Sequence, residues 1–144
     1  MTVDEQIKAA YTNKVEKNLE KAVRIVALQA YTNIVINTPV GNPDLWQSPA
    51  PEGYVGGRAR ANWNIDINTV DLSVSDSTEE PDTSKALGVT ARYKMSDTIY
   101  ISNNLPYIQR LNDGWSSQAP ANFVDASIMI GSRQAKQIIK RDVQ

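Results

Sequence analysis

The 144-residue chain has no cysteine and no histidine. The missing cysteine excludes a disulfide framework and thiolate chemistry, and the missing histidine removes the usual general base at neutral pH and the commonest zinc ligand. No apolar run approaches the roughly eighteen residues of a membrane-spanning helix, and charged residues begin at Asp4. We therefore expect no signal peptide, no transmembrane segment, no metal and no cofactor, and synthesis in a cytoplasm.

Neither sign of charge dominates, because 15 basic residues stand against 16 acidic ones and the net charge is −1. Such a balance does not by itself indicate nucleic acid or a membrane as a partner. The charge is uneven along the chain, since residues 38–81 hold two basic and seven acidic residues and residues 82–144 hold eight and five. This pattern favours complementary contacts between subunits; the alternative is charge that only solvates loops and a helix face.

The length predicts a single domain over residues 1–144, and an apolar fraction of 41% predicts a modest core. A thin core favours a domain that gains part of its stability from neighbouring subunits. We find no internal repeat and no low-complexity tract.

Residues 3–37 are predicted to form one long helix. Its apolar residues recur three or four positions apart, and Asp4 and Glu5 occupy the first turn, where acidic groups favour the helix dipole. At 1.5 Å per residue the helix would be about 50 Å long, more than a domain of this size needs. Its end reaches a neighbouring subunit, or the helix is kinked or split near residues 32–36. The apolar stripe comprises Ile7, Tyr11, Val15, Leu19, Ala22, Val26 and Ala30.

A long loop is predicted at residues 39–57, after the Thr38-Pro39 step that ends the helix. Its Gly41–Gly57 portion holds three prolines, four glycines and the aromatics Trp46 and Tyr54. A connection of this length without secondary structure favours a contact arm in an oligomer. The alternative is a disordered insertion.

Alternation of polar and apolar residues after Gly57 predicts a strand over residues 58–67. Its arginines, Arg58 and Arg60, are expected to face outward. A second alternating set at residues 70–74 has the opposite parity, so a bulge or turn near residues 68–69 would let both sets reach one core. The residues expected in that core are Trp63, Ile65, Ile67, Val70, Leu72 and Val74.

Three shorter segments are predicted next. Residues 75–84 form a polar, acidic loop, and residues 83–93 form a short helix with Leu87 and Ala91 on one side. The β-branched run at residues 98–102 is typical of a strand.

The strand leads into a compact module at residues 103–120. Pro106 ends the strand because it has no N–H for a ladder, and Tyr107, Ile108 and Leu111 follow at the spacing of one helical turn. Gly114 supplies a stop, and the loop beyond it carries Trp115. The module contains no evident catalytic set.

A second helix is predicted at residues 122–142, so the fold class is α+β: a long N-terminal helix and a C-terminal helix packed on a small, mostly antiparallel sheet. Basic side chains gather on the helix side opposite the apolar one. The apolar side is assigned Phe123, Ile128, Ala135, Ile138 and Ile139, and the basic side Arg133, Lys136, Lys140 and Arg141.

Catalysis is not expected. An enzyme needs a nucleophile with a base, a metal set or a carboxylate pair in a pocket. The acidic pairs Asp66/Asp71 and Asp76/Glu79 fall on an outer strand face or in a loop, where solvation and capping are the favoured roles. Arg58 and Arg60 are too few for a DNA-binding face, so pairing with acids such as Asp66 is preferred over phosphate contacts.

Three motifs follow one another along the chain: Thr38-Pro39-Val40, then Gly57-Arg58-Ala59-Arg60-Ala61-Asn62-Trp63, then Asn103-Asn104-Leu105-Pro106-Tyr107 with a short helix, a glycine and Ser116-Ser117-Gln118-Ala119-Pro120. In this order they resemble the neck and tail-completion proteins of tailed bacteriophages, similar to the lambda-type tail-completion protein. The order and spacing extend the resemblance over most of the chain. The sequence departs from the family by inserting Gly41 to Gly56, where relatives often have only Asp-Thr.

The resemblance implies a structural virion protein of the head–tail junction, assembled in the host bacterial cytoplasm. It would form a six-fold or twelve-fold ring around the DNA path through a heterologous contact that closes by rotation. Its partners would be itself and the portal, adaptor and tail proteins, with DNA only as passing cargo and no membrane or small-molecule substrate. A tail terminator or tail-tube-associated protein is one alternative, and a small DNA-binding packaging accessory protein is another.

Tyrosine, tryptophan and arginine are the usual anchors of interfaces. Replacement of Trp115 by alanine is accordingly expected to weaken assembly more than folding. Three basic residues of the C-terminal helix are candidates for contacts along the DNA path: Arg133, Lys136 and Lys140. The residues predicted for subunit and partner contacts are Trp46, Tyr54, Arg58, Arg60, Tyr107, Arg110 and Trp115.

Overall fold

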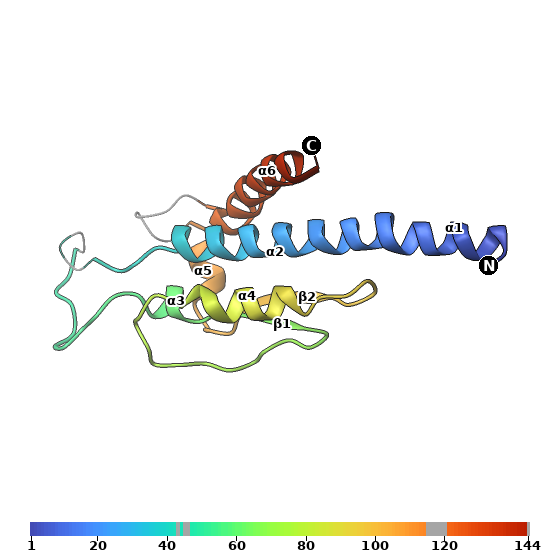
Figure 1. Cartoon of the computed structure of the whole chain (residues 1–144). Coiled ribbons are helices and arrows are strands. Elements are labelled where there is room, and N and C mark those ends of the chain that lie inside the picture. The colour runs from blue at the N-terminus through green and yellow to red at the C-terminus, as the bar shows by residue number, and fades with distance from the viewer. Residues whose placement is uncertain (43, 45–46, 115–120, 144) are drawn as a thin grey trace.

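The computed structural model of the protein describes residues 1–42, 44, 47–114 and 121–143. The fold is α+β, as the sequence predicts, with a long helical segment at each end and a two-stranded antiparallel sheet between them (Figure 1). The elements in order are α1 (Val3–Tyr11), a π-helical segment η1 (Thr12–Glu16), α2 (Lys17–Asn37), α3 (Arg58–Ala61), β1 (Trp63–Ile67), α4 (Thr83–Ala91), β2 (Ile99–Asn103), α5 (Ile108–Asn112) and α6 (Phe123–Val143).

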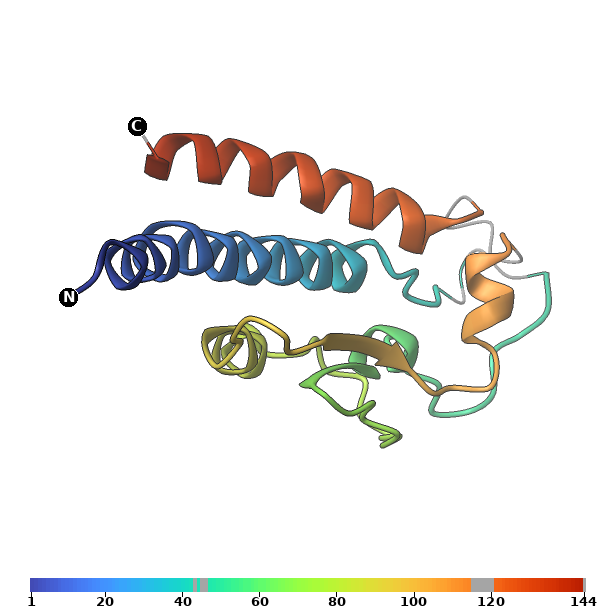
Figure 2. The ribbon, with the colours of Figure 1, turned by 90° about the vertical axis from the view of Figure 1, so that its right-hand side faces the viewer.

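The layers are stacked around α2, which lies between α6 on one side and the sheet on the other (Figure 2). Contacts between α2 and α6 are the most extensive of any two elements, and α4 packs against both α2 and β1. Helix α6 therefore packs mainly on α2, on the side away from the sheet. Among the described residues, no helix is long and apolar enough to cross a membrane.

The helix predicted over residues 3–37 is present, because α1, η1 and α2 follow one another directly. It begins with a capping box in which the Glu5 N–H donates to the Thr2 hydroxyl at 3.1 Å and the Thr2 N–H donates to the Glu5 carboxylate at 2.7 Å. The alternative of a break near residues 32–36 is wrong, since these residues are α-helical and the irregular turn lies at Thr12–Glu16.

The N-terminal part of this helix projects beyond the rest of the molecule (Figure 1). Neither α1 nor η1 contains a buried residue, whereas Ala30, Tyr31, Asn33, Ile34 and Val35 of α2 are buried. Of the predicted stripe residues only Ala30 is buried, and those toward the projecting end are exposed. We call the exposed apolar residues of the projecting end, with Val3 added to the predicted set, the arm stripe; they are between 41% and 70% exposed and comprise Val3, Ile7, Tyr11, Val15 and Leu19.

The core lies between α2 and one face of the sheet. β1 pairs with β2 in antiparallel register, with Ile65 opposite Ile101, and Ile65 is fully buried. As predicted, Trp63 and Ile65 face inward, and Ile67 packs against the same core. The buried cluster consists of Tyr31, Ile34, Val35, Trp63, Ile65, Ala86, Val89 and Phe123.

The strand predicted over residues 58–67 is wrong in its first half, because Arg58–Ala61 is a short helix and the strand starts at Trp63. Gly57 precedes the helix at φ 113°, a left-handed conformation that favours glycine, and its carbonyl accepts from the Ala61 N–H at 2.9 Å. The Asn62 amide then donates to the Arg58 carbonyl at 2.7 Å, which closes the turn. These local bonds outweigh the alternation of residues 58–62.

The prediction that Val70, Leu72 and Val74 reach the core is also wrong. Their side chains are 41%, 74% and 49% exposed, and residues 70–74 form no strand. A turn does occur at Asn68, where φ is 63°, but the chain beyond it is held by side-chain amides instead of a strand ladder.

The remaining helices have the predicted positions and partly different inner faces. In α4 the buried residues are Ala86, Val89 and Thr90, whereas Leu87, which the sequence places on one side with Ala91, is 51% exposed. β2 begins one residue later than predicted, at Ile99. In α5 the predicted turn is present, and Gly114 ends it at φ 89°.

The packed face of α6 consists of small residues, together with Phe123. Ser127, Gly131 and Ala135 are buried at intervals of four, whereas Ile128, assigned to this side from the sequence, is 40% exposed. A Cβ on Gly131 would lie 2.8 Å from the backbone nitrogen of Ala30. The α2 and α6 backbones therefore approach closely at a position that only glycine fits.

Candidate functional site

Three of the predicted interface residues lie together: Tyr54 in the long loop, Arg58 in α3 and Tyr107 just before α5. Their proximity is evident in the pKa of the Tyr107 phenol, which burial raises above its ordinary value, the Arg58 guanidinium lowers and Tyr54 raises, with a net upward shift. Both tyrosines remain accessible, at 38% and 37% exposure. We call these three residues the Tyr107 cluster.

The Tyr107 cluster and the arm stripe lie at different ends of the molecule. Helices α3 and α5 lie at the end opposite the projecting α1 (Figure 1). The chain thus presents an apolar helical surface at one end and an aromatic and basic surface at the other.

Arg58 bonds within its own chain. Its Nε donates to the Ser75 carbonyl at 3.2 Å, and its terminal nitrogen lies 3.2 Å from the Asp76 carboxylate. The expected intramolecular pairing with an acid is therefore present, but with Asp76 in place of Asp66, whose carboxylate accepts the Ile67 N–H. Since Asp76 is fully exposed, this ion pair contributes little to stability.

Arg60 and Arg110 lie elsewhere in the same region. Arg60 is partly buried, its guanidinium lies close to Gly57, and its Nε is buried without a hydrogen-bond partner among the described residues. Arg110 is an exposed residue of α5. Trp46 and Trp115, the other two predicted contact residues, lie outside the described residues.

Three asparagines hold residues 71–75 by side-chain hydrogen bonds that were not predicted from the sequence. We call Asn62, Asn64 and Asn104 the asparagine clamp. The Asn62 amide donates to the Ser75 carbonyl at 2.9 Å and accepts the Ser75 N–H at 2.8 Å. Asn104 and Asn64 donate to the Asp71 carbonyl at 2.8 and 3.3 Å, and Asn64 reaches the Ser73 carbonyl at 3.1 Å. The sequence did contain a signal for this clamp. Asn62 and Asn64 are two residues apart, on either side of Trp63, and this spacing places both amides on the face opposite the Trp63 side chain.

Asp71 fixes the start of the clamped segment. Hydrogen bonds from the Ser73 side chain and backbone hold the pKa of the Asp71 carboxyl below its ordinary value, and Lys85, 3.3 Å away, acts in the same direction. The segment is therefore attached both to the polar face of the sheet and to α4.

The candidate DNA-path residues share an exposed side of α6. Arg133, Lys136 and Lys140 are all exposed, and the buried positions of the helix face α2. Their spacing of three and four places them on one face.

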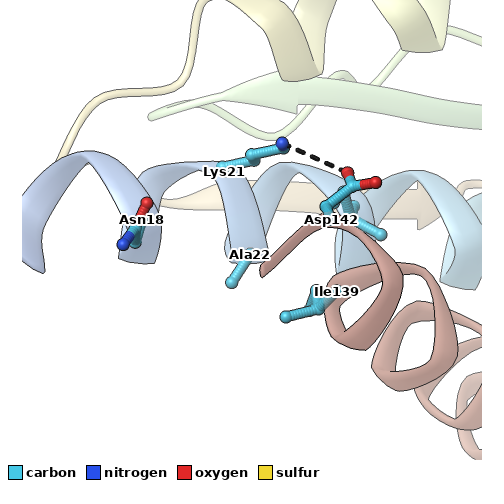
Figure 3. A pocket seen from close by; sticks show the side chains of 6 residues that line it. Asn18, Lys21, Ala22, Ile139 and Asp142 are labelled. Atoms are coloured by element: carbon cyan, nitrogen blue, oxygen red, sulfur yellow. Dashed lines mark ion pairs between the residues drawn. The ribbon is translucent and has the colours of Figure 1, made fainter. Parts of the chain in front are cut away.

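A small hollow of about 230 Å³ lies where α6 ends against α2. Figure 3 shows Lys21 and Asp142 facing each other across its edge, with their charged atoms 3.1 Å apart. Asn18, Ala22 and Ile139 complete much of the lining. The lining offers one exposed ion pair and no nucleophile with a base, so the hollow has the character of a packing defect at a helix end.

A second hollow, of about 480 Å³, lies between α2 and β2 and is mostly apolar. Val26 of α2 and Ile99 and Ile101 of β2 line it. In the described parts of the chain, no three acidic side chains gather in a way that would hold a metal ion.

Comparison of the chain with protein-family models, with curated proteins and with solved structures finds no match in any of the three.

Proposed function

We propose that this protein is a structural subunit of the head–tail junction of a tailed bacteriophage, a neck or tail-completion protein that assembles into a ring around the DNA path. The motif order at Thr38, Gly57–Trp63 and Asn103–Tyr107 supports the assignment to this class. Its partners would be further copies of itself and the portal, adaptor and tail proteins of the virion. A tail terminator or tail-tube-associated protein is the neighbouring alternative.

The observation that carries the proposal is the arm stripe. Five apolar side chains on a projecting helix are exposed in the single chain, and an exposed apolar stripe of this kind marks an interaction surface. A self-assembling subunit accounts for it directly, because the arm of one copy would lie on the next copy.

Magnitudes indicate that the arm stripe does not act alone. Full burial of a valine, leucine or isoleucine contributes about 1.5–3 kcal/mol, so covering the exposed half of the four aliphatic side chains and of Tyr11 contributes on the order of 5 kcal/mol. Loss of translational and rotational freedom on association costs about 4–15 kcal/mol. Assembly therefore needs at least one further contact surface, and ring closure is favourable because it gains contacts at both ends of every copy.

Electron micrographs of the purified protein, alone and mixed with neck partners, test the proposal. We expect closed rings with a single rotational symmetry. Only monomers under both conditions would contradict it.

Exposed basic residues on α6 favour a second candidate, a small DNA-binding packaging accessory protein. Arg133, Lys136 and Lys140 share one face, as a phosphate-binding helix requires. Duplex DNA binding that weakens steeply with added salt would support this candidate. Absence of binding at low salt would remove it.

A further inference from the structure

The outer edge of β2 is open. The Asn68 N–H donates to the Thr98 carbonyl at 2.7 Å, and the Thr98 N–H donates to the Asn68 side chain at 2.9 Å. The backbone groups of Thr98 therefore point toward the chain segment that contains β1. Because antiparallel pairs alternate, the backbone groups of Ile99 and Ile101 point away from β1. The sheet in the described part of the chain has only the strands β1 and β2, so no third strand pairs with these groups.

The two sides of the sheet differ in how they are filled. On the β1 side, α4 packs against both the strand and α2. On the β2 side, the apolar groove of about 480 Å³ takes the equivalent position, under the open edge. Val23, Val26 and Ala27 of α2 form its floor, and Ile99 and Ile101 form its wall. An open strand edge above an apolar groove is the arrangement that accepts an added strand.

The same chain carries a segment with the matching pattern. The carbonyls of Asp71, Ser73 and Ser75 all accept from the asparagine clamp, and this alternation is that of an extended chain. The backbone groups of the intervening Leu72 and Val74 have no hydrogen-bond partner among the described residues. One backbone edge of the segment is thus hydrogen-bonded to the asparagine clamp, and the other edge is not. The apolar side chains of Val70, Leu72 and Val74 are exposed.

We propose that residues 70–74 of one copy add as a third, antiparallel strand to the β2 edge of a second copy, with Leu72 opposite Ile101 and its side chain in the groove above Val26. The contact is heterologous, since the segment and the edge are different surfaces of the chain, and it propagates from copy to copy. It rests on the proposed self-assembly and supplies the second contact surface that the arm stripe requires.

Charge favours the antiparallel direction. Acidic residues follow the segment, including the exposed Glu79 and Glu80, and the exposed Arg92 and Lys94 precede β2. We call the proposed contact between residues 70–74 of one copy and the β2 edge of the next the joint. Antiparallel pairing brings these two charged groups to the same end of the joint. Asp97 also lies at that end and stays negatively charged, but Arg92 and Lys94 outnumber it, so this end keeps a net positive charge.

Disulfide trapping between two single-cysteine variants tests the joint, because the native chain has no cysteine. Leu72→Cys is mixed with Val26→Cys under mild oxidation, and the mixed dimer is measured by non-reducing electrophoresis and mass spectrometry. Both positions are exposed in the single chain, so neither variant disturbs the core. We expect the mixed dimer to form about tenfold faster than one between Val26→Cys and the matched control Leu87→Cys on α4, because the joint raises the effective concentration.

Equal rates for Leu72→Cys and Leu87→Cys would overturn the proposal. A faster reaction of Val26→Cys with Ile7→Cys would also overturn it, because the groove would then hold the arm helix of the second copy. The two proposals are tested separately. A fast mixed disulfide without closed rings in micrographs would support the joint and contradict the ring. Closed rings with a slow mixed disulfide would support the ring and contradict the joint.

Discussion

The indole N–H of Trp63 donates to the hydroxyl of Thr38 at 2.7 Å, and that hydroxyl donates to the Ile34 carbonyl at 2.6 Å. Both side chains are buried, and the bond ties the start of β1 to the end of α2. Thr38 and Trp63 belong to two of the three sequence motifs, 25 residues apart. These two motif residues are therefore explained by the core.

Thr38→Val is expected to lower the free energy of unfolding by about 1–3 kcal/mol, because it leaves the buried Trp63 N–H without its acceptor. Thr38→Ser keeps the hydroxyl and is the matched control, with a smaller loss. Urea denaturation measures both variants. Equal stability of Thr38→Val and the native chain would show that the bond does not hold β1 to α2.

Two glycine substitutions are expected to have opposite effects. Gly131→Ala gains about 1 kcal/mol of helix propensity and loses about 1–3 kcal/mol because its Cβ overlaps the α2 backbone, so it destabilises. Gly88→Ala in α4 meets no atom within 4 Å and is expected to stabilise by about 0.5–1 kcal/mol. Chemical denaturation compares the two, and stabilisation by Gly131→Ala would contradict the close approach of α6 and α2.

The Asp97 carboxyl is expected to titrate below the ordinary aspartate range. The Asn68 amide, 3.0 Å away, and the Lys94 N–H, 2.9 Å away, both favour the charged form and lower the pKa of Asp97. A lowered folded pKa stabilises the fold above the unfolded pKa of about 4, and this contribution is lost as the pH falls through the folded value.

Asn68→Gly removes the larger cause of that shift and suits the positive φ of 63°. NMR titration of the Asp97 carboxyl carbon should give a higher pKa in this variant than in the native chain, and a weaker fall of stability in acid. An unchanged pKa would show that the Asn68 bond is not formed in solution.

The projecting arm should tolerate polar substitution in the single chain. Ile7 is 61% exposed, so Ile7→Lys should change the free energy of unfolding by no more than about 0.5 kcal/mol. Assembly should be lost, because the lysine charge would be buried in the contact. Asn13→Lys, exposed and away from the stripe, is the charge-matched control and should still assemble. Equal assembly of the two variants, measured by sedimentation velocity, would remove the arm stripe from the interface.

Much of the fold was predictable because its signals are local. The long helix, α4, α6 and the pairing partner at residues 98–102 follow from periodicity, caps and β-branched runs. The strand predictions were wrong where side-chain hydrogen bonds replace the backbone hydrogen bonds of a β-sheet. Asn62 draws residues 58–61 into a helical turn, and the asparagine clamp holds residues 71–75 by side-chain bonds, which alternation alone does not reveal.

The candidate surfaces were predictable only in part. Aromatic and arginine content selected Tyr54, Arg58 and Tyr107, which the structure brings together. The apolar stripe gave no indication of which of its residues are buried, because that depends on where α6 and the sheet end along α2. The open β2 edge was not visible in the sequence, since it depends on no other described strand pairing on that side of β2.

Native mass spectrometry of the wild-type protein, alone and with neck partners, tests the central claim most directly. The account predicts one closed assembly of defined copy number, six or twelve, that Ile7→Lys abolishes while Asn13→Lys preserves it. A wild-type protein that is strictly monomeric under both conditions would contradict it.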